Sequence, residues 1–191
     1  MRSVLMVCHG NICRSPMAAT LMRVMAEAAG WDDALWVDSC GVSDEEEGNP
    51  MDRRAVAMLL SHGIRPAPHE ARRFSRGDYA MYDDILCMEE RNRRGLLRLL
   101  GGDPEGKLRL LLDYTDDPHD IEDPWYSGDF EKPTVRSLKR PFSRLIVRRS
   151  VSVWVGWLCP PSPALMTGTS ERIEATSGAP SFGWRMAMMS A

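Results

Sequence analysis

The chain lacks an apolar run long enough to cross a membrane, and we expect no secretory signal. Its first apolar run stops at His9, whereas a signal peptide continues for a longer apolar stretch. The apolar part of 151–159 is short and contains Ser152 and Gly156, so it falls well below the length of a transmembrane helix. We therefore expect a cytoplasmic protein with no membrane partner.

Cysteine is sparse, and its spacing excludes two common uses. The chain holds five cysteines, an odd number spread over its length, which is not the pattern of a secreted disulfide framework. Cys8 and Cys13 do not have C-x2-C spacing, and no His or Cys pair follows at zinc spacing. We therefore expect no metal and no cofactor. Cys40 and Cys87 lie in apolar stretches and are expected to pack in the core.

A strong net charge is also missing. The formal net charge of −3 argues against a nucleic-acid partner. Residues 1–130 carry a net charge of −9 and residues 131–191 carry +6, so two compositions meet near residue 130. Much of the second part is rich in Ser, Pro, Gly and Met without a period. We predict one domain over 1–130 and a divergent, basic, poorly ordered segment over 131–191.

Strand and helix patterns alternate along the first 130 residues. Apolar runs predict strands at Val4–Val7, Ala34–Val37, Ile85–Met88 and Leu108–Leu112. Helical periodicity, with early Pro16 or a following Gly, predicts helices at Pro16–Ala29, Asp52–Leu60 and Glu89–Leu100. This alternation favours an α/β fold, a four-stranded parallel sheet with helices on both faces. Ligands bind beyond the carboxyl ends of such strands, which is where Cys8 lies.

The stretch VCHGNICRSP, residues 7–16, places a C-x5-R-S pattern between the first strand and the first helix. Backbone N–H groups of such a turn, together with the helix N-terminus, bind a phosphate-sized anion. Arg14 has the planar fork that matches two phosphate oxygens, and Gly10 is expected to allow unusual backbone angles. A thiol at the base of this phosphate loop has a depressed pKa, so Cys8 is the candidate nucleophile.

Two polar side chains of the same stretch are expected to support Cys8. Ser15 can donate its hydroxyl proton to the thiolate or to the leaving sulfur, and Asn11 can brace the turn through its amide. The alternative, that Cys8 is only a buried thiol at a strand end, leaves Gly10 and Arg14 at their spacings unexplained.

A thiolate that attacks phosphorus needs a general acid for the leaving oxygen. The acidic loop 114–130 offers several carboxylates. Asp123 is preferred because Trp125 and Tyr126 follow it and could form the wall of a cleft for an aromatic substrate. The alternatives in the same loop are Asp116, Asp117 and Asp120.

The two segments VCHGNICRSP and Asp123–Tyr126 resemble the low-molecular-weight protein tyrosine phosphatases, and the resemblance covers roughly residues 1–130. It implies that Cys8 is the nucleophile, that Arg14 binds phosphate and stabilises the transition state, and that Ser15 assists the thiolate. It further implies that Asp123 acts first as acid and then as base. The implied activity is hydrolysis of phosphotyrosine in proteins or peptides through a cysteinyl-phosphate intermediate.

The resemblance also assigns substrate contacts and a redox role. The implied substrate-binding residues are His9, Gly10, Asn11, Ile12, Cys13, Arg14, Trp125 and Tyr126. Cys13 is implied to protect oxidised Cys8 by forming a reversible disulfide, which suits a neighbouring thiol.

The sequence departs from this family in two places. Ser43–Glu47 stands where the family usually carries a cleft-lining aromatic residue, and its carboxylates are expected to shift preference toward substrates with basic flanking residues. Beyond Phe130 the expected final helix is not recognisable. Two alternatives follow: a phosphotyrosine-binding pseudo-phosphatase, or an arsenate reductase of the same fold, which would need further thiols in a mobile loop and is disfavoured because Cys87 lies in a predicted strand.

Overall fold

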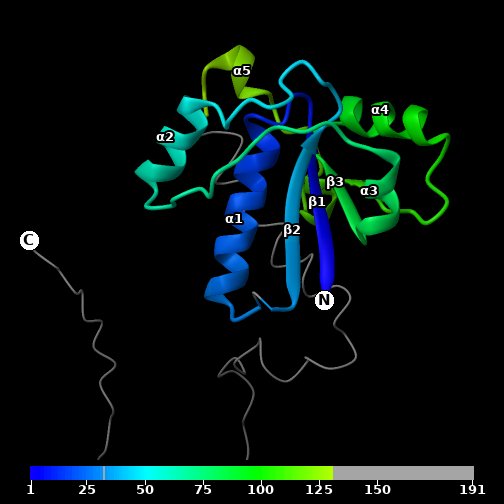
Figure 1. Ribbon diagram of the computed structural model, residues 1–191, viewed down its shortest axis with the longest axis horizontal. Coiled ribbons are helices and arrows are strands. Elements are labelled where there is room, and N and C mark those ends of the chain that lie inside the picture. The colour runs from blue at the N-terminus through cyan, green and yellow to red at the C-terminus, as the bar shows by residue number, and fades with distance from the viewer. Residues whose placement is uncertain (32, 131–191) are drawn as a thin grey trace, which may run out of the picture. The chain divides into compact units, whose positions relative to one another are not determined.

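The computed structural model describes residues 1–31 and 33–130, which fold around one parallel sheet (Figure 1). The sheet has four strands in the order β2-β1-β3-β4, and each neighbouring pair is parallel. The strands are β1 (Arg2–Cys8), β2 (Leu35–Gly41), β3 (Asp84–Cys87) and β4 (Leu108–Leu110). The predicted four-stranded parallel sheet is confirmed, whereas the predicted segment 131–191 lies outside the described residues.

Helices connect the strands and continue past the last one. They are α1 (Arg14–Ala28), α2 (Arg53–Ser61), α3 (Arg76–Met81), α4 (Glu90–Leu100), the 3-10 helix η1 (Leu111–Tyr114) and α5 (Pro124–Ser127). The three predicted helices are present with ends shifted by one or two residues. Pro16 lies in the first turn of α1, where the backbone N–H groups have no partner within the helix.

Three short elements were not predicted from the sequence. The strand expected at Leu108–Leu112 ends at Leu110 in the structure. The Asp113 carboxylate accepts a hydrogen bond from Leu110 N at 3.0 Å, and the chain turns into η1 there. Helix α3 begins where Ser75 and Asp78 form a capping box. The acidic loop holds α5, because the Asp123 side chain caps a turn whose first residue is Pro124.

The sheet is buried on both faces, as the side chains of β1 show. Val4 and Met6 belong to the core cluster that includes residues of α1 and α2, whereas Leu5 and Val7 pack in the cluster with Tyr82 and residues of α4. A strand buried on both sides reads as a continuous apolar run rather than an alternating one. This explains why the first strand was readily recognised in the sequence.

The topology places a binding site at the carboxyl end of β1. From β1 the chain passes to β2 on one side, and it later returns to β3 on the other side, so β1 flanks the switch point at which α/β sheets bind ligands. Helices α2 and α5 lie toward this end of the sheet (Figure 1). The turn after β1 packs tightly on Gly41, where an added Cβ would lie 2.6 Å from the His9 carbonyl oxygen.

Candidate active site

The segment that joins β1 to α1 forms the predicted phosphate loop around the Cys8 thiol. Cys8 is the last residue of β1 and is 3% exposed. Its sulfur accepts a hydrogen bond from the backbone N–H of Asn11 at 3.3 Å and lies 3.0 Å from the Ser15 hydroxyl oxygen. One backbone donor therefore reaches the sulfur and the Ser15 hydroxyl can supply a second, an arrangement that can stabilise a thiolate.

Asn11 is the residue whose backbone takes the left-handed conformation in this loop, with φ of 62°. The expectation that Gly10 supplies the unusual angles is wrong, since Gly10 is not among the described residues with positive φ. Asn tolerates this region because its side chain forms local hydrogen bonds. Gly10 is needed for space instead, because a Cβ there would lie 3.0 Å from Glu46 Cγ.

Asn11 braces the loop, as predicted, through three contacts of its side-chain amide and one contact of its backbone carbonyl. Its Nδ2 donates to Ser15 Oγ at 2.9 Å and to Ser39 Oγ at 3.0 Å. Its Oδ1 accepts from the backbone N–H of Arg72 at 3.0 Å, and its carbonyl oxygen lies 2.6 Å from His69 Nε2. Ser39, His69 and Arg72 were not singled out from the sequence, because their side chains or backbone reach the loop only through tertiary folding.

The Ser15 hydroxyl has one proton and two acceptors within reach. Its oxygen lies 3.3 Å from the Cys40 carbonyl oxygen and 3.0 Å from the Cys8 sulfur. When Cys8 is a thiol, Ser15 can donate to Cys40 and accept from the sulfur. When Cys8 is a thiolate, the hydroxyl proton can turn to the sulfur. The Ser15 oxygen then no longer accepts from the thiol, but it still accepts a hydrogen bond from Asn11 Nδ2.

The guanidinium group of Arg14 is held from several sides. Arg14 is 1% exposed. Its Nη1 donates to the Ile121 carbonyl oxygen at 3.0 Å, and its Nη2 donates to Glu89 Oε1 at 3.1 Å and to Asp123 Oδ2 at 2.5 Å. Asn92 donates to the same Glu89 oxygen at 3.1 Å. These contacts fix the planar fork at the pocket, with its charge balanced by two carboxylates.

Glu89 is a site residue that the sequence analysis missed. The sequence carried one usable signal, since Glu89 follows the third strand and therefore lies at the carboxyl end of the sheet.

Asp123 lies where the general acid was expected. Its Oδ2 accepts from Arg14 at 2.5 Å and its Oδ1 accepts from the backbone N–H of Trp125 at 3.1 Å. Asp123 therefore serves both as the cap of α5 and as an ion-pair partner of Arg14. The alternative carboxylates Asp116, Asp117 and Asp120 are not among the described residues that line the pocket over Cys8. Asp120 instead accepts a hydrogen bond from the backbone N–H of Glu90 at 2.8 Å.

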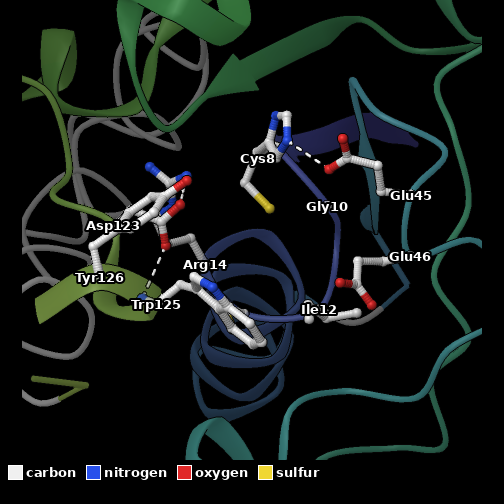
Figure 2. Close-up of a pocket in the computed structure, with 11 residues that line it drawn as sticks. Cys8, Gly10, Ile12, Arg14, Glu45, Glu46, Asp123, Trp125 and Tyr126 are labelled. Carbon is white, nitrogen blue, oxygen red and sulfur yellow. Dashed lines mark hydrogen bonds and ion pairs between the residues drawn. The ribbon is translucent and has the colours of Figure 1, made fainter. Parts of the chain in front are cut away.

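One pocket gathers most of the predicted site residues (Figure 2). Its phosphate-loop wall consists of Cys8, His9, Gly10, Ile12, Cys13 and Arg14. Figure 2 shows the side chains of Asp123, Trp125 and Tyr126 on one side and those of Glu45 and Glu46 on the other. Asn11 and Ser15 are buried behind the loop and do not line the pocket, so the Asn11 side chain supports the loop rather than the substrate.

The two walls of the pocket differ in chemistry. Trp125 and Tyr126 are 50% and 83% exposed and form an aromatic wall. On the opposite side, Glu45 Oε2 lies 3.2 Å from His9 Nε2, and Glu46 packs against Gly10. The carboxylates that were noted in the sequence therefore belong to the rim of the pocket itself.

Cys13 shares the pocket with Cys8 and is kept in its thiol form. Burial raises the pKa of Cys13 to about 12, and the neighbouring Asp52 carboxylate adds to this effect. Two further thiols, Cys40 in β2 and Cys87 in β3, are fully buried, and burial raises the pKa of each. Thiols fixed in strands are unsuited to the disulfide relay of an arsenate reductase.

Two absences concern the part of the chain that the structure describes. Within it, no group of three or more His, Cys, Asp or Glu side chains is arranged to hold a metal ion. No helix in residues 1–31 and 33–130 is long and apolar enough to span a membrane.

Comparison with known proteins places this fold and site among the cysteine-dependent phosphatases. A family model described as low molecular weight phosphotyrosine protein phosphatase matches residues 3–148, a range that extends past Phe130. The chain therefore belongs to the low molecular weight phosphotyrosine protein phosphatase family, and the predicted resemblance is confirmed.

Individual relatives agree with this assignment. The chain is 40% identical over 137 residues to the human low molecular weight phosphotyrosine protein phosphatase, covering 70% of this chain and 86% of that protein. It is 37% identical over 134 residues to the Bacillus subtilis low molecular weight protein-tyrosine-phosphatase YfkJ, covering 69% of this chain and 86% of the relative. The crystal structure of YfkJ superposes with a TM-score of 0.75 and 33% identity, covering 80% of this chain and 97% of that one.

Proposed function

We propose that this phosphatase hydrolyses phosphotyrosine and related aryl phosphate monoesters through a cysteinyl-phosphate intermediate on Cys8. The observation that carries the proposal is the meeting of Cys8, Arg14 and Asp123 in one pocket. These are a sulfur that accepts from the Asn11 N–H and lies 3.0 Å from the Ser15 hydroxyl oxygen, a guanidinium group held by three acceptor atoms at 2.5–3.1 Å, and the carboxyl group that is one of these three partners. Acid, nucleophile and anion-binding group are the parts that phosphoryl transfer to sulfur requires.

The first step transfers the phosphoryl group to sulfur. The Cys8 thiolate attacks phosphorus, an S–P bond forms, and the bond from phosphorus to the aryl oxygen breaks. Protonated Asp123 donates its proton to the leaving oxygen, which departs as the phenol. The Arg14 fork stabilises the oxygens of the transferring group, so Asp123 has to release Arg14 to the phosphate before it acts on the leaving oxygen.

The second step regenerates the enzyme. A water molecule attacks phosphorus while the Asp123 carboxylate accepts its proton, and the S–P bond breaks to release inorganic phosphate. The leaving thiolate is stabilised by the Asn11 N–H and by the Ser15 hydroxyl proton, which turns from the Cys40 carbonyl to the sulfur. Asp123 thus acts as acid and then as base.

The walls of the pocket support an aryl substrate on a protein or peptide. Trp125 and Tyr126 offer exposed aromatic faces beside the acid, and aromatic rings pack favourably against each other. The relatives are named as phosphotyrosine protein phosphatases, which supports a tyrosine-phosphorylated protein as the partner.

We also propose a reducing compartment, the cytoplasm, as the place of action. The four cysteines of the described part are unpaired thiols, and a nucleophilic Cys8 has to stay reduced to work. Cys13 fits the protective role, since a sulfenic acid on Cys8 condenses with a nearby thiol to a disulfide and water.

A metal-free assay with an aryl phosphate tests the proposed function. The unmodified protein, in the presence of a chelator, is expected to hydrolyse p-nitrophenyl phosphate and a phosphotyrosine peptide. Cys8→Ser should abolish turnover of both, and Asp123→Ala should lower kcat/KM for the peptide by about 10²-fold or more, which is the usual contribution of a general acid.

Two outcomes of this assay would overturn the proposal. Full activity of Cys8→Ser would exclude the thiol mechanism. Tight binding of the phosphotyrosine peptide by the unmodified protein without any turnover would favour a binding module instead.

A further inference from the structure

The guanidinium group of Arg54, in the first turn of α2, lies over two aromatic rings of the segment that carries Asp123. Its Cζ is 4.9 Å from the centroid of the Trp125 ring and 4.8 Å from that of Phe130. Both distances fall within the range of a cation–π contact. Trp125 lines the pocket and Phe130 is buried, so Arg54 holds α5 and the residues after it against α2.

Arg54 is itself anchored to a fixed point. Its Nε and Nη2 donate to the two carboxylate oxygens of Asp52 at 3.1 and 3.0 Å. The Asp52 backbone N–H donates to the carbonyl oxygen of Ile12, in the phosphate loop, at 2.8 Å. The Asp52 carboxylate therefore orients the Arg54 guanidinium group through two hydrogen bonds, and the Asp52 backbone is bound to the loop that surrounds Cys8.

These contacts close a ring around the pocket. From the phosphate loop the connection runs through Asp52 and Arg54 to Trp125, whose backbone N–H donates to Asp123 Oδ1 at 3.1 Å. Asp123 Oδ2 in turn accepts a hydrogen bond from Arg14 at 2.5 Å, and this contact leads back to the phosphate loop. Helices α2 and α5 lie on the same side of the sheet end (Figure 1), and the Trp125 side chain forms part of the pocket wall in Figure 2.

We propose that Arg54 is a positioning residue that sets the place of the general acid by clamping Trp125 and Phe130 to α2. This inference rests on the proposed role of Asp123. When a substrate phosphate takes Arg14, Asp123 loses its 2.5 Å partner, and the remaining contacts that hold its segment over the leaving oxygen include the Arg54 clamp. A small displacement of a catalytic group is costly in rate.

The clamp depends on the shape of arginine as well as on its charge. A planar guanidinium group stacks on rings while its fork holds a carboxylate, whereas the ammonium group of lysine acts as a point charge. Arg53, the exposed residue that precedes Arg54 at the start of α2, is not among the residues that line the pocket. Arg53→Ala is therefore the matched control for Arg54→Ala.

The experiment measures kcat/KM for a series of aryl phosphates whose leaving phenols differ in pKa, with unmodified protein and four variants: Arg54→Ala, Arg54→Lys, Arg53→Ala and Asp123→Ala. Phenyl phosphate needs the acid more than p-nitrophenyl phosphate does, because its leaving oxygen is more basic. We expect Arg54→Ala and Arg54→Lys to lower kcat/KM for phenyl phosphate by about tenfold and for p-nitrophenyl phosphate by less than threefold. Arg53→Ala should match the unmodified protein.

The double variant Arg54→Ala/Asp123→Ala separates positioning of the acid from other effects. If Arg54 acts through Asp123, its loss should change kcat/KM less than twofold once Asp123 is absent, because coupled residues are not additive. Equal losses for both substrates, an undiminished effect in the double variant, or full rescue by lysine would overturn the inference. If Asp123→Ala itself shows no dependence on the leaving group, the proposed role of Asp123 fails instead, and the two failures are thereby distinguished.

Discussion

At the scale of single residues, Glu45 and Glu46 give the mouth of the pocket a negative charge beside a phosphate-binding loop. Glu45 is largely exposed, with its carboxylate 3.2 Å from His9 Nε2, and both glutamates line the pocket. A dianionic phosphate approaching between them is repelled, whereas a basic residue next to the phosphotyrosine is attracted. We therefore expect charge at this rim to influence which substrates are selected.

Replacing these carboxylates should change selectivity more than it changes chemistry. Glu45→Gln and Glu46→Gln are each expected to lower the preference for a phosphotyrosine peptide with flanking lysines over one with flanking glutamates by about two- to fivefold, since exposed pairs contribute up to about 1 kcal/mol. The measurement is the ratio of kcat/KM for the two peptides at low and at high salt. The ratios of the variants and of the unmodified protein should converge at high salt, because salt screens the charges of the rim.

Glu47→Gln serves as the control for the rim, because Glu47 is exposed in the same run but does not line the pocket. A selectivity ratio that is the same in Glu45→Gln, Glu47→Gln and the unmodified protein would show that the rim does not select substrates.

At the scale of elements, the turn after β1 is shaped by its contact with β2. A Cβ added to Gly41 would lie 2.6 Å from the His9 carbonyl oxygen and 3.2 Å from Asn11 N. These are backbone atoms, so the phosphate loop has to shift. Gly41→Ala is expected to lower the free energy of unfolding by about 1–3 kcal/mol, the usual effect of overpacking, and to lower kcat/KM as well.

Gly95→Ala is the matched glycine variant within α4. Its added Cβ would lie 3.8 Å from Val42 Cγ1 and 3.9 Å from Val42 Cβ, which are ordinary contacts. Because alanine favours a helix interior, this variant should raise the free energy of unfolding by up to about 1 kcal/mol and leave kcat/KM unchanged. Urea unfolding and the aryl phosphate assay together check both variants. Equal stability of Gly41→Ala and the unmodified protein would contradict the packing argument.

The elements also show how far the sequence alone could lead. Strand β1 was predicted because burial on both faces leaves a continuous apolar run, and helix α1 because Pro16 and Gly30 mark its two ends. Helix α5 was missed because its four residues are too few to carry a period, and it is held by the cap from Asp123 and by Arg54 from α2. The contact with Arg54 joins residues far apart in sequence and leaves no local pattern.

The same limit applies to the site. Cys8 and Arg14 were predicted because both belong to one short segment with fixed spacing. Glu89 reaches Arg14 from the end of β3, and Ser39 and His69 reach Asn11 from other segments. The unusual backbone angles were assigned to Gly10 instead of Asn11. The hydrogen bonds of the Asn11 side chain with Ser39 and Arg72 form only when distant segments fold together, so they leave no local pattern.

At the scale of the whole molecule, buried thiols link folding to pH. Burial raises the pKa of Cys13 to about 12 and raises that of Cys40 well above the ordinary 9.0. Each group is protonated in the folded state while the unfolded chain releases the proton above pH 9. The stability from these groups is therefore fully present below pH 9 and is lost as pH rises toward the folded pKa.

A variant without one of these thiols should show a weaker dependence on alkaline pH. The free energy of unfolding of the unmodified protein, measured with urea between pH 8 and pH 11, is expected to fall with pH. Cys40→Ala should reduce the slope above pH 9 by up to about 1.4 kcal/mol per pH unit, the value for one proton. The slope is independent of the loss of packing that the substitution causes. Identical slopes in the two proteins would refute this linkage.

The central claim for the whole molecule is that catalysis passes through a phosphate bound covalently to Cys8. The most direct measurement mixes the protein with p-nitrophenyl phosphate, stops the reaction with acid within its first turnover, and locates phosphate in peptides by mass spectrometry. We expect phosphate on Cys8, more of it in Asp123→Ala because water is then not activated, and none in Cys8→Ser. Release of inorganic phosphate without any phosphate on Cys8, or with phosphate on His9 instead, would contradict it.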